Sequence, residues 1–241
     1  MSKPIALVGH RAGMDLIIDI TDAMGLEIAG IFDKYFYGNT DSTEGIPFIG
    51  NEEEITEDDI EKYNFVLTSN YVGHAKLTNY EHNGDNLRQR RIKIFKDRNL
   101  PTANLIHPNS YVGDKTHIGS SVIIGRDCYV RANSHIGDFC FLDSGAAVAH
   151  DVHLGENVII TPYSFVAGFV NIGNNVMIGA GSKIVNGYSD RSLNIGDNVK
   201  VMAGSTVFKD VPEGKFVTNT GKILRRIDLK KEKEKENGLQ D

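Results

Sequence analysis

The sequence predicts two domains of different architecture, an α/β domain over residues 1–100 and a parallel β-helix over residues 101–221, followed by a charged tail at residues 222–241. Three observations predict this. An aliphatic residue recurs every six positions in the second half, strand-like and helix-like segments alternate in the first half, and the last dozen residues are nearly all charged or polar. A chain of 241 residues is long enough for two domains with separate cores.

The six-residue repeat is the strongest pattern in the chain. Fourteen consecutive positions spaced by six are aliphatic: Ile106, Val112, Ile118, Ile124, Val130, Ile136, Leu142, Val148, Leu154, Ile160, Val166, Ile172, Ile178 and Ile184. A helical period does not produce this spacing. Short strands joined by sharp corners do, with three strands making a coil of about 18 residues that stacks on the next coil at ~4.8 Å. Glycines that follow many of these positions, such as Gly113 and Gly119, are expected to relieve strain at the corners.

The repeat is interrupted once. After Ile184 the aliphatic register resumes at Ile195, which leaves five extra residues between 186 and 194. We expect these residues to form a loop extruded from one corner.

The first hundred residues have the pattern of an α/β domain. Residues 4–9 form a strand-like apolar run, followed by a loop with Gly9 and Gly13, an amphipathic helix to about Met24 and a second strand at 27–32. The turn between the first strand and the helix is a natural site for a phosphate, because a helix N-terminus presents free N–H groups.

Two further elements complete this domain. A strand at 64–68 ends at the edge of the sheet where parallel α/β sheets bind ligands. A helix at 87–98 carries Arg88, Arg90 and Arg91, which we expect on a solvated face.

Composition excludes several classes of function. The net charge of −6 argues against a general nucleic-acid binder, and no apolar run approaches the ~20 residues that span a membrane. The N-terminal segment lacks the features of a signal peptide, so a cytoplasmic protein is predicted. Cys128 and Cys140 form no disulfide framework and are expected to be buried.

One histidine has the surroundings of a catalytic base. His150 is followed directly by Asp151, while the residues one coil away on either side, Ala132 and Gly168, are small and leave space for substrates. A neutral imidazole accepts a proton readily near neutral pH. Either Asp151 or Asp143 could accept a hydrogen bond from the second ring nitrogen and fix the tautomer.

The repeat resembles the hexapeptide-repeat acyltransferases, which have left-handed β-helices and form trimers with active sites between subunits. Residues 142–179 are similar to the family of sialic acid O-acetyltransferases and bacillosamine-pathway sugar N-acetyltransferases. The similarity extends through GIFDK at 30–34, EGIPFIG at 44–50 and ANLIHP at 103–108. The resemblance implies that acetyl-CoA is the co-substrate and that His150 is the general base, paired with the acidic residue Asp151. It also implies that the N–H of Gly168 contacts the thioester region of acetyl-CoA.

Two further groups of site residues follow from the resemblance. The positions implied near the pantetheine arm and phosphates of the cofactor are Gly179, Ala180, Gly181, Lys183, Ala203, Gly204 and Lys209. A Rossmann-like domain in these proteins binds the nucleotide of a sugar nucleotide. The positions that it implies for nucleotide contact are Gly9, His10, Asp33, Lys34, Ser69 and Asn70.

A metal enzyme is the rival interpretation of the histidines. His117, His135 and His153 are spaced by 18 residues and should stack as a ladder. Three imidazoles from two subunits hold zinc in carbonic anhydrase-like β-helices, but those proteins also have a His pair five residues apart, which this repeat lacks. We therefore predict no metal.

The function predicted is acetyl-CoA-dependent N-acetylation of the amino group of a nucleotide-linked amino deoxy sugar by a homotrimer. O-acetylation of a sugar such as a sialic acid is the first alternative, since a hydroxyl needs the same base. The second alternative is a non-catalytic trimeric scaffold that binds sugar nucleotides, because a fold alone does not fix a function.

Overall fold

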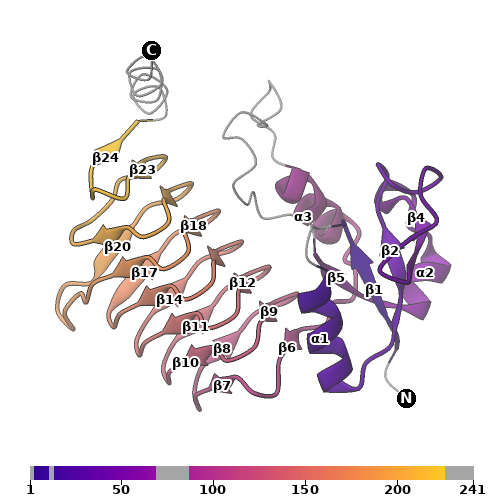
Figure 1. The fold of residues 1–241 in the computed structure, drawn as a ribbon, viewed down its shortest axis with the longest axis horizontal. Helices are drawn as coiled ribbons and strands as arrows, with labels where there is room; N and C mark the ends of the chain where they lie inside the picture. Colours follow the sequence, from indigo (N-terminus) through magenta and orange to yellow (C-terminus); the bar gives the residue numbers. More distant parts are fainter. Residues whose placement is uncertain (1–2, 11–13, 69–86, 226–241) are drawn as a thin grey trace. The chain divides into compact units, whose positions relative to one another are not determined.

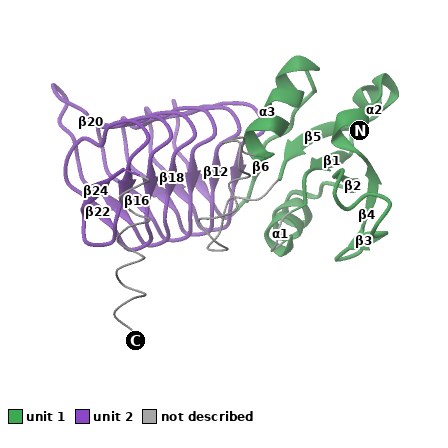
Figure 2. Cartoon of the chain, turned by 90° about the horizontal axis from the view of Figure 1, so that it is seen from above, with its two compact units in different colours: residues 1–108 green, residues 109–241 purple. Residues whose placement is uncertain are grey.

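The chain folds into two compact units, residues 1–108 and 109–241 (Figure 2). A computed structural model describes residues 3–10, 14–68 and 87–225 (Figure 1). The predicted division after residue 100, and the assignment of residues 222–241 to a tail, stay predictions.

The first unit is built on a five-stranded sheet. In sheet order its strands are β3 (Ser42–Thr43), β4 (Ile46–Gly50), β2 (Ile28–Phe32), β1 (Ile5–Val8) and β5 (Asn64–Leu67). β1 is buried throughout and pairs in parallel with both β2 and β5, which explains its continuous apolar sequence. Because the chain moves to opposite sides of β1 to form β2 and β5, the strand order reverses there, which is where such sheets bind ligands.

Helices and short segments surround this sheet. They are α1 (Asp15–Met24), the 3₁₀ turn η1 (Glu52–Glu54), α2 (Glu57–Lys62) and α3 (Leu87–Asp97). α1 ends at Gly25, whose φ of 65° is the left-handed conformation that favours glycine at a helix C-terminus. The predicted βαβ start, the strand at 64–68 and the helix at 87–98 are confirmed, whereas β3, β4 and α2 were not predicted.

The second unit is a coil of two- and three-residue strands in three sheets, which are parallel except at the last described strand. The first sheet contains β7 (Tyr111–Val112), β10 (Tyr129–Val130), β13 (Ala147–Val148), β16 (Phe165–Val166), β19 (Lys183–Ile184) and β22 (Thr206–Val207). The second contains β8 (His117–Ile118), β11 (His135–Ile136), β14 (His153–Leu154), β17 (Val170–Ile172) and β20 (Leu193–Ile195). The third contains β6 (Leu105–Ile106), β9 (Ile123–Ile124), β12 (Phe141–Leu142), β15 (Ile159–Ile160), β18 (Met177–Ile178), β21 (Lys200–Val201), β23 (Phe216–Val217) and β24 (Ile223–Leu224).

Successive coils pair in register. Val130 lies opposite Val148, 18 residues later, as the repeat predicts. Ile172 lies opposite Ile195, so the extra five residues are extruded between β19 and β20, and this prediction is also confirmed. β24 pairs antiparallel with β23 and lies inside the segment assigned to the tail.

The corners of the coil show a second period of six. A positive φ recurs at Lys115, Ser121, Asp127, Asn133, Phe139, Gly145, Asp151, Asn157, Tyr163, Phe169, Asn175 and Gly181. Most of these residues are not glycine, so the packed coil holds them in a conformation that such side chains seldom adopt.

The glycines that follow the core residues have a different role from the one predicted. Gly113, Gly137 and Gly179 have no positive φ. A Cβ at Gly113 would lie 2.6 Å from the next coil's backbone, and one at Gly137 or Gly179 only 2.4 Å from it. The expectation that these glycines relieve corner strain was therefore wrong, because they are needed for the close approach of adjacent coils.

The outward face of the second sheet carries the histidine ladder. His117, His135 and His153 stack with ring centroids 4.5 Å apart and planes inclined by 12°, which confirms the prediction. Partial burial, reinforced by the two neighbouring imidazoles, lowers the pKa of His135. Among the described residues, no group of three or more His, Cys, Asp or Glu side chains could hold a metal ion. No helix in the described part of the chain is long and apolar enough to cross a bilayer.

Candidate active site

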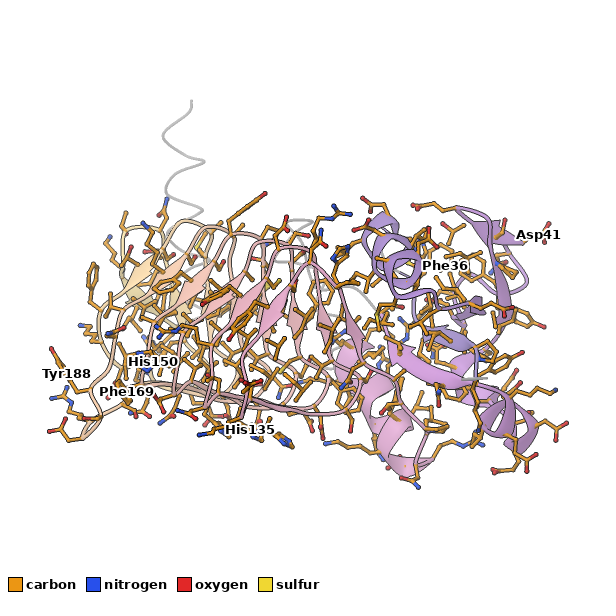
Figure 3. All side chains as sticks on the ribbon, turned by 90° about the horizontal axis from the view of Figure 1, so that it is seen from below. Phe36, Asp41, His135, His150, Phe169 and Tyr188 are labelled. Carbon is orange, nitrogen blue, oxygen red and sulfur yellow. The ribbon has the colours of Figure 1, made fainter. Side chains whose placement is uncertain are left out.

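The predicted base and its acid are in direct contact. Nδ1 of His150 (Figure 3) lies 2.7 Å from Oδ2 of Asp151. Both side chains are about one-third exposed. A carboxylate can only accept, so the proton of this bond belongs to Nδ1 and the lone pair of the neutral ring is on Nε2. Asp151 has a φ of 54°, so the conformation of the corner itself brings its carboxylate beside the ring of the preceding residue.

Gly168 lies directly beside the imidazole. A Cβ on this glycine would be 2.8 Å from Cε1 and 3.0 Å from Nε2 of His150. Phe169 contacts the same imidazole edge-on, with centroids 5.2 Å apart and planes at 84°. The side of the corner occupied by Gly168 is thus kept free of a side chain, while an aromatic ring holds His150 in place.

The backbone N–H of Gly168 has a partner in this structure. It donates a hydrogen bond of 3.0 Å to Oδ1 of Asn186, one coil further on. The strand register continues this row, so that Ala132, His150, Gly168, Asn186 and Lys209 follow one another along the edge between the first and second sheets. We call this row the histidine edge.

Asp143 lies on another edge of the coil. It is buried between the third and first sheets, and its Oδ1 accepts the N–H of Ser144 at 2.7 Å. Within one chain, β13 separates Asp143 from His150. Of the two carboxylates predicted to orient the base, Asp151 is the one in contact with it.

Most of the positions predicted for the cofactor share the edge of Asp143. Gly179, Ala180 and Gly181 follow β18 in the third sheet, and Ala203 and Gly204 lie one coil later. Lys183 is exposed on the adjoining first sheet. Lys209 and Gly168, the position predicted to contact the thioester region, belong to the histidine edge, and Lys209 lies three coils from His150. These residues therefore lie along two different edges of the same coil.

In the first unit, the structure brings four predicted nucleotide-binding residues together at the carboxyl edge of β1 and β2. The N–H of His10 donates to Oδ2 of Asp33 at 2.8 Å, and Thr68 donates its hydroxyl to the carbonyl of Gly9 at 2.5 Å. Gly9 has a φ of 91°, which requires glycine. Lys34 follows Asp33. The hydrogen bond from the Lys34 ammonium to Glu53 is the main cause that raises the pKa of Lys34. Ser69 and Asn70 lie outside the described residues.

Asp33 is held by an ion-pair network that the sequence did not reveal. Arg91 contacts Oδ2 of Asp33 at 2.9 Å and Oε1 of Glu52 at 2.7 Å, and all three side chains are almost fully buried. Asp33 also accepts the N–H of Tyr35 at 2.9 Å. Arg88 is buried as well, so the expectation of a solvated arginine face on α3 was wrong for Arg88 and Arg91.

Aromatic side chains surround the same loop. The ring of His10 lies 4.6 Å from that of Phe36, which stacks on Phe48 at 5.5 Å. Phe36 stands three positions after Asp33, in the loop that follows β2 (Figure 3). The sequence-based prediction did not include these rings.

Family models match the coil of the second unit. Residues 105–138 and 133–168 match bacterial transferase hexapeptide repeats, and residues 169–209 match the hexapeptide repeat of succinyl-transferase. The second unit is a hexapeptide-repeat β-helix. No curated protein matches the chain.

Solved structures extend the likeness to both units. Perosamine N-acetyltransferase from Caulobacter crescentus, crystallised with CoA and GDP-perosamine, is 24% identical, with a TM-score of 0.77 over 92% of this chain and 96% of that one. The acetyltransferase domain of PglB from Neisseria gonorrhoeae, in complex with acetyl coenzyme A, is 22% identical, with a TM-score of 0.75 over 93% of this chain and 100% of that one. WeeI from Acinetobacter baumannii is 21% identical, with a TM-score of 0.73 over 92% and 100%. These similarities establish the fold, an α/β unit followed by a left-handed hexapeptide-repeat β-helix.

Proposed function

We propose that the chain is an acetyl-CoA-dependent N-acetyltransferase that acts on the amino group of a nucleotide-linked amino deoxy sugar. The observation that carries the proposal is the bond between His150 and Asp151, 2.7 Å long, beside a glycine that brings no side chain against Nε2. The fold supports it, since similar structures over both units were crystallised with CoA, acetyl-CoA or an amino-sugar nucleotide.

The proposed reaction needs a single base. The amino nitrogen of the sugar attacks the thioester carbonyl carbon of acetyl-CoA and forms a C–N bond. Nε2 of His150 takes a proton from that nitrogen. Asp151 keeps the ring in its orientation, and its carboxylate stabilises the positive charge of the imidazolium that forms. The tetrahedral intermediate then breaks its C–S bond, and the leaving thiolate takes the proton from the imidazolium.

The Gly168 N–H is proposed to stabilise the oxyanion of the intermediate. A preorganised donor contributes most where negative charge develops during the reaction. In this structure the N–H donates to Asn186, so the role requires that this bond be exchanged for one to the substrate.

Sites shared between subunits of a trimer are part of the proposal. The histidine edge and the edge that carries most of the predicted cofactor residues lie on opposite sides of the first sheet. They can border one site only if one edge comes from a second copy of the chain. A trimer would bring such edges together, and it would cover faces that a solenoid otherwise leaves exposed.

The first unit is proposed to bind the nucleotide. Gly9 and His10 lie at the carboxyl end of β1, where the strand order reverses, and parallel α/β sheets bind ligands at this position. The cytoplasmic location predicted from the sequence stays a prediction.

Thiol release from acetyl-CoA tests the proposal. The purified chain should release CoA with a panel of 3-amino and 4-amino sugars linked to GDP, UDP or dTDP, and much more slowly with the matching 3-hydroxy and 4-hydroxy sugar nucleotides. Faster release with hydroxyl acceptors, including free sialic acids, would favour O-acetylation. Nucleotide-sugar binding without thiol release for any acceptor would indicate a non-catalytic scaffold.

A further inference from the structure

The hydrogen bond between Gly168 and Asn186 occupies a donor that the proposed reaction needs. The N–H can only donate, so the side-chain atom facing it at 3.0 Å is the carbonyl oxygen of Asn186. Gly168 is buried, and a buried N–H without a partner is costly. Asn186 therefore satisfies this donor in the absence of substrate.

The oxygen of Asn186 and the proposed base meet at the same residue. The imidazole of His150 lies beside the Cα of Gly168, 2.8 Å from the position that a Cβ would take. The N–H of the same glycine donates to Asn186. A thioester carbonyl whose oxygen replaced that of Asn186 would sit beside Nε2, where the attacking amine must lose its proton.

We infer that Asn186 is a placeholder for the acyl oxygen: its Oδ1 occupies the Gly168 N–H at rest and gives way to the carbonyl oxygen of acetyl-CoA. The inference rests on the proposed function. An amide oxygen and a thioester oxygen are both sp² carbonyl acceptors, so they compete for the same position. Once the oxyanion forms, a charged acceptor binds the N–H roughly twice as strongly as a neutral one, which favours the exchange.

Asn186 is placed so that it can leave. Its side chain is exposed, and the bond to Gly168 is the one side-chain hydrogen bond that it makes within the described residues. It also begins the extruded loop, which contains Tyr188 (Figure 3). The backbones of Tyr188 and Arg191 pair with each other and close this loop. Displacing this side chain therefore disturbs no other polar contact of the described part.

A second asparagine, Asn174, provides a matched control, because it is also a corner cap, a side chain that accepts a backbone N–H at a corner of the neighbouring coil. Oδ1 of Asn174 accepts the N–H of Glu156 at 2.8 Å, again one coil away, on the edge between the second and third sheets. No member of the proposed site lies on that edge. Asn174 is also bonded to Asp197 through its own N–H and its Nδ2, so it belongs to a ladder of structural caps.

Binding of acetyl-CoA and of CoA to Asn186→Ala and Asn174→Ala tests the inference, because CoA lacks the acyl carbonyl. Measured by isothermal titration calorimetry, the affinity of Asn186→Ala for acetyl-CoA should rise about two- to tenfold over wild type, since one neutral hydrogen bond no longer competes. Its affinity for CoA should not change, and Asn174→Ala should change neither. The KM for acetyl-CoA should fall without a loss in kcat.

Three results would overturn the inference. If Asn186→Ala binds acetyl-CoA with the wild-type affinity, Asn186 is a structural corner cap like Asn174. A lower kcat in Asn186→Ala would indicate that the Asn186 amide donates directly to the substrate. An equal rise in the affinities for CoA and acetyl-CoA would exclude competition between Asn186 and the acyl oxygen. Asn186→Leu, which keeps the branched shape without an acceptor, repeats the test if the alanine variant does not fold. A wild-type chain that binds neither ligand would refute the proposed function, and the inference with it.

Discussion

Gly168→Ala should abolish most of the transferase activity while the chain stays folded. The new methyl carbon would lie 2.8 Å from Cε1 and 3.0 Å from Nε2 of His150, against an ordinary carbon contact of about 3.5–4.0 Å. The ring must therefore move by roughly 1 Å, and a displacement of that size lowers the rate by about 100-fold when it misplaces a reacting group. Thiol release with saturating acetyl-CoA and the best acceptor measures this loss.

Gly155→Ala is the control for simple overcrowding. A Cβ there would meet the Asn174 amide oxygen at 2.7 Å and the backbone of Gly173 at 2.9 Å, in the same coil but away from His150. Both variants should lose about 1–3 kcal/mol of stability. Only Gly168→Ala should lose activity, and near-normal turnover by this variant, or an equal loss in Gly155→Ala, would refute the reasoning.

Three further predictions concern stability and reactivity. Arg91→Met should lower the free energy of unfolding in urea by about 3–5 kcal/mol, because it leaves two buried carboxylates without their cation; a loss below about 1 kcal/mol would contradict the network's role. The lowered pKa of His135 means that the unfolded chain binds more protons near pH 6, so its contribution to stability should be complete above about pH 6.5 and be lost as the pH falls through the folded-state pKa. His135→Asn should weaken this acid dependence in urea titrations, and an unchanged profile would count against it. Burial raises the pKa of Cys128 to about 11, so this thiol should react with Ellman's reagent at pH 8 only after unfolding, and reaction in the native state would show that it is accessible.

The sequence was sufficient for the architecture of the second unit because its period of six is a direct consequence of the coil. Adding 18 to a residue number gives its neighbour in the next coil, and adding 23 across the extruded loop does the same. That arithmetic placed Gly168 beside His150. The role of the repeat glycines was misjudged, since periodicity does not distinguish a strained φ from a close approach between coils.

Other parts of the site depend on information that the sequence pattern does not contain. Arg91 reaches carboxylates 58 and 39 residues away, so its burial follows from tertiary packing and not from the local charge of α3. Asn186 stands 18 residues after Gly168 and could have been found from the register, but its hydrogen bond depends on a side-chain rotamer. The adjacency of His150 and Asp151 was predictable from sequence, whereas their contact depends on the left-handed conformation of Asp151.

The central claim is that the His150 imidazole accepts the proton of the attacking amine, and His150→Ala tests it most directly. Its side chain is about one-third exposed, so the variant should keep the wild-type circular dichroism spectrum. Thiol release should fall by about 10²- to 10⁴-fold, the usual contribution of a general base, while His135→Ala in the ladder keeps the wild-type rate. A folded His150→Ala protein that transfers acetyl groups at the wild-type rate would contradict the account.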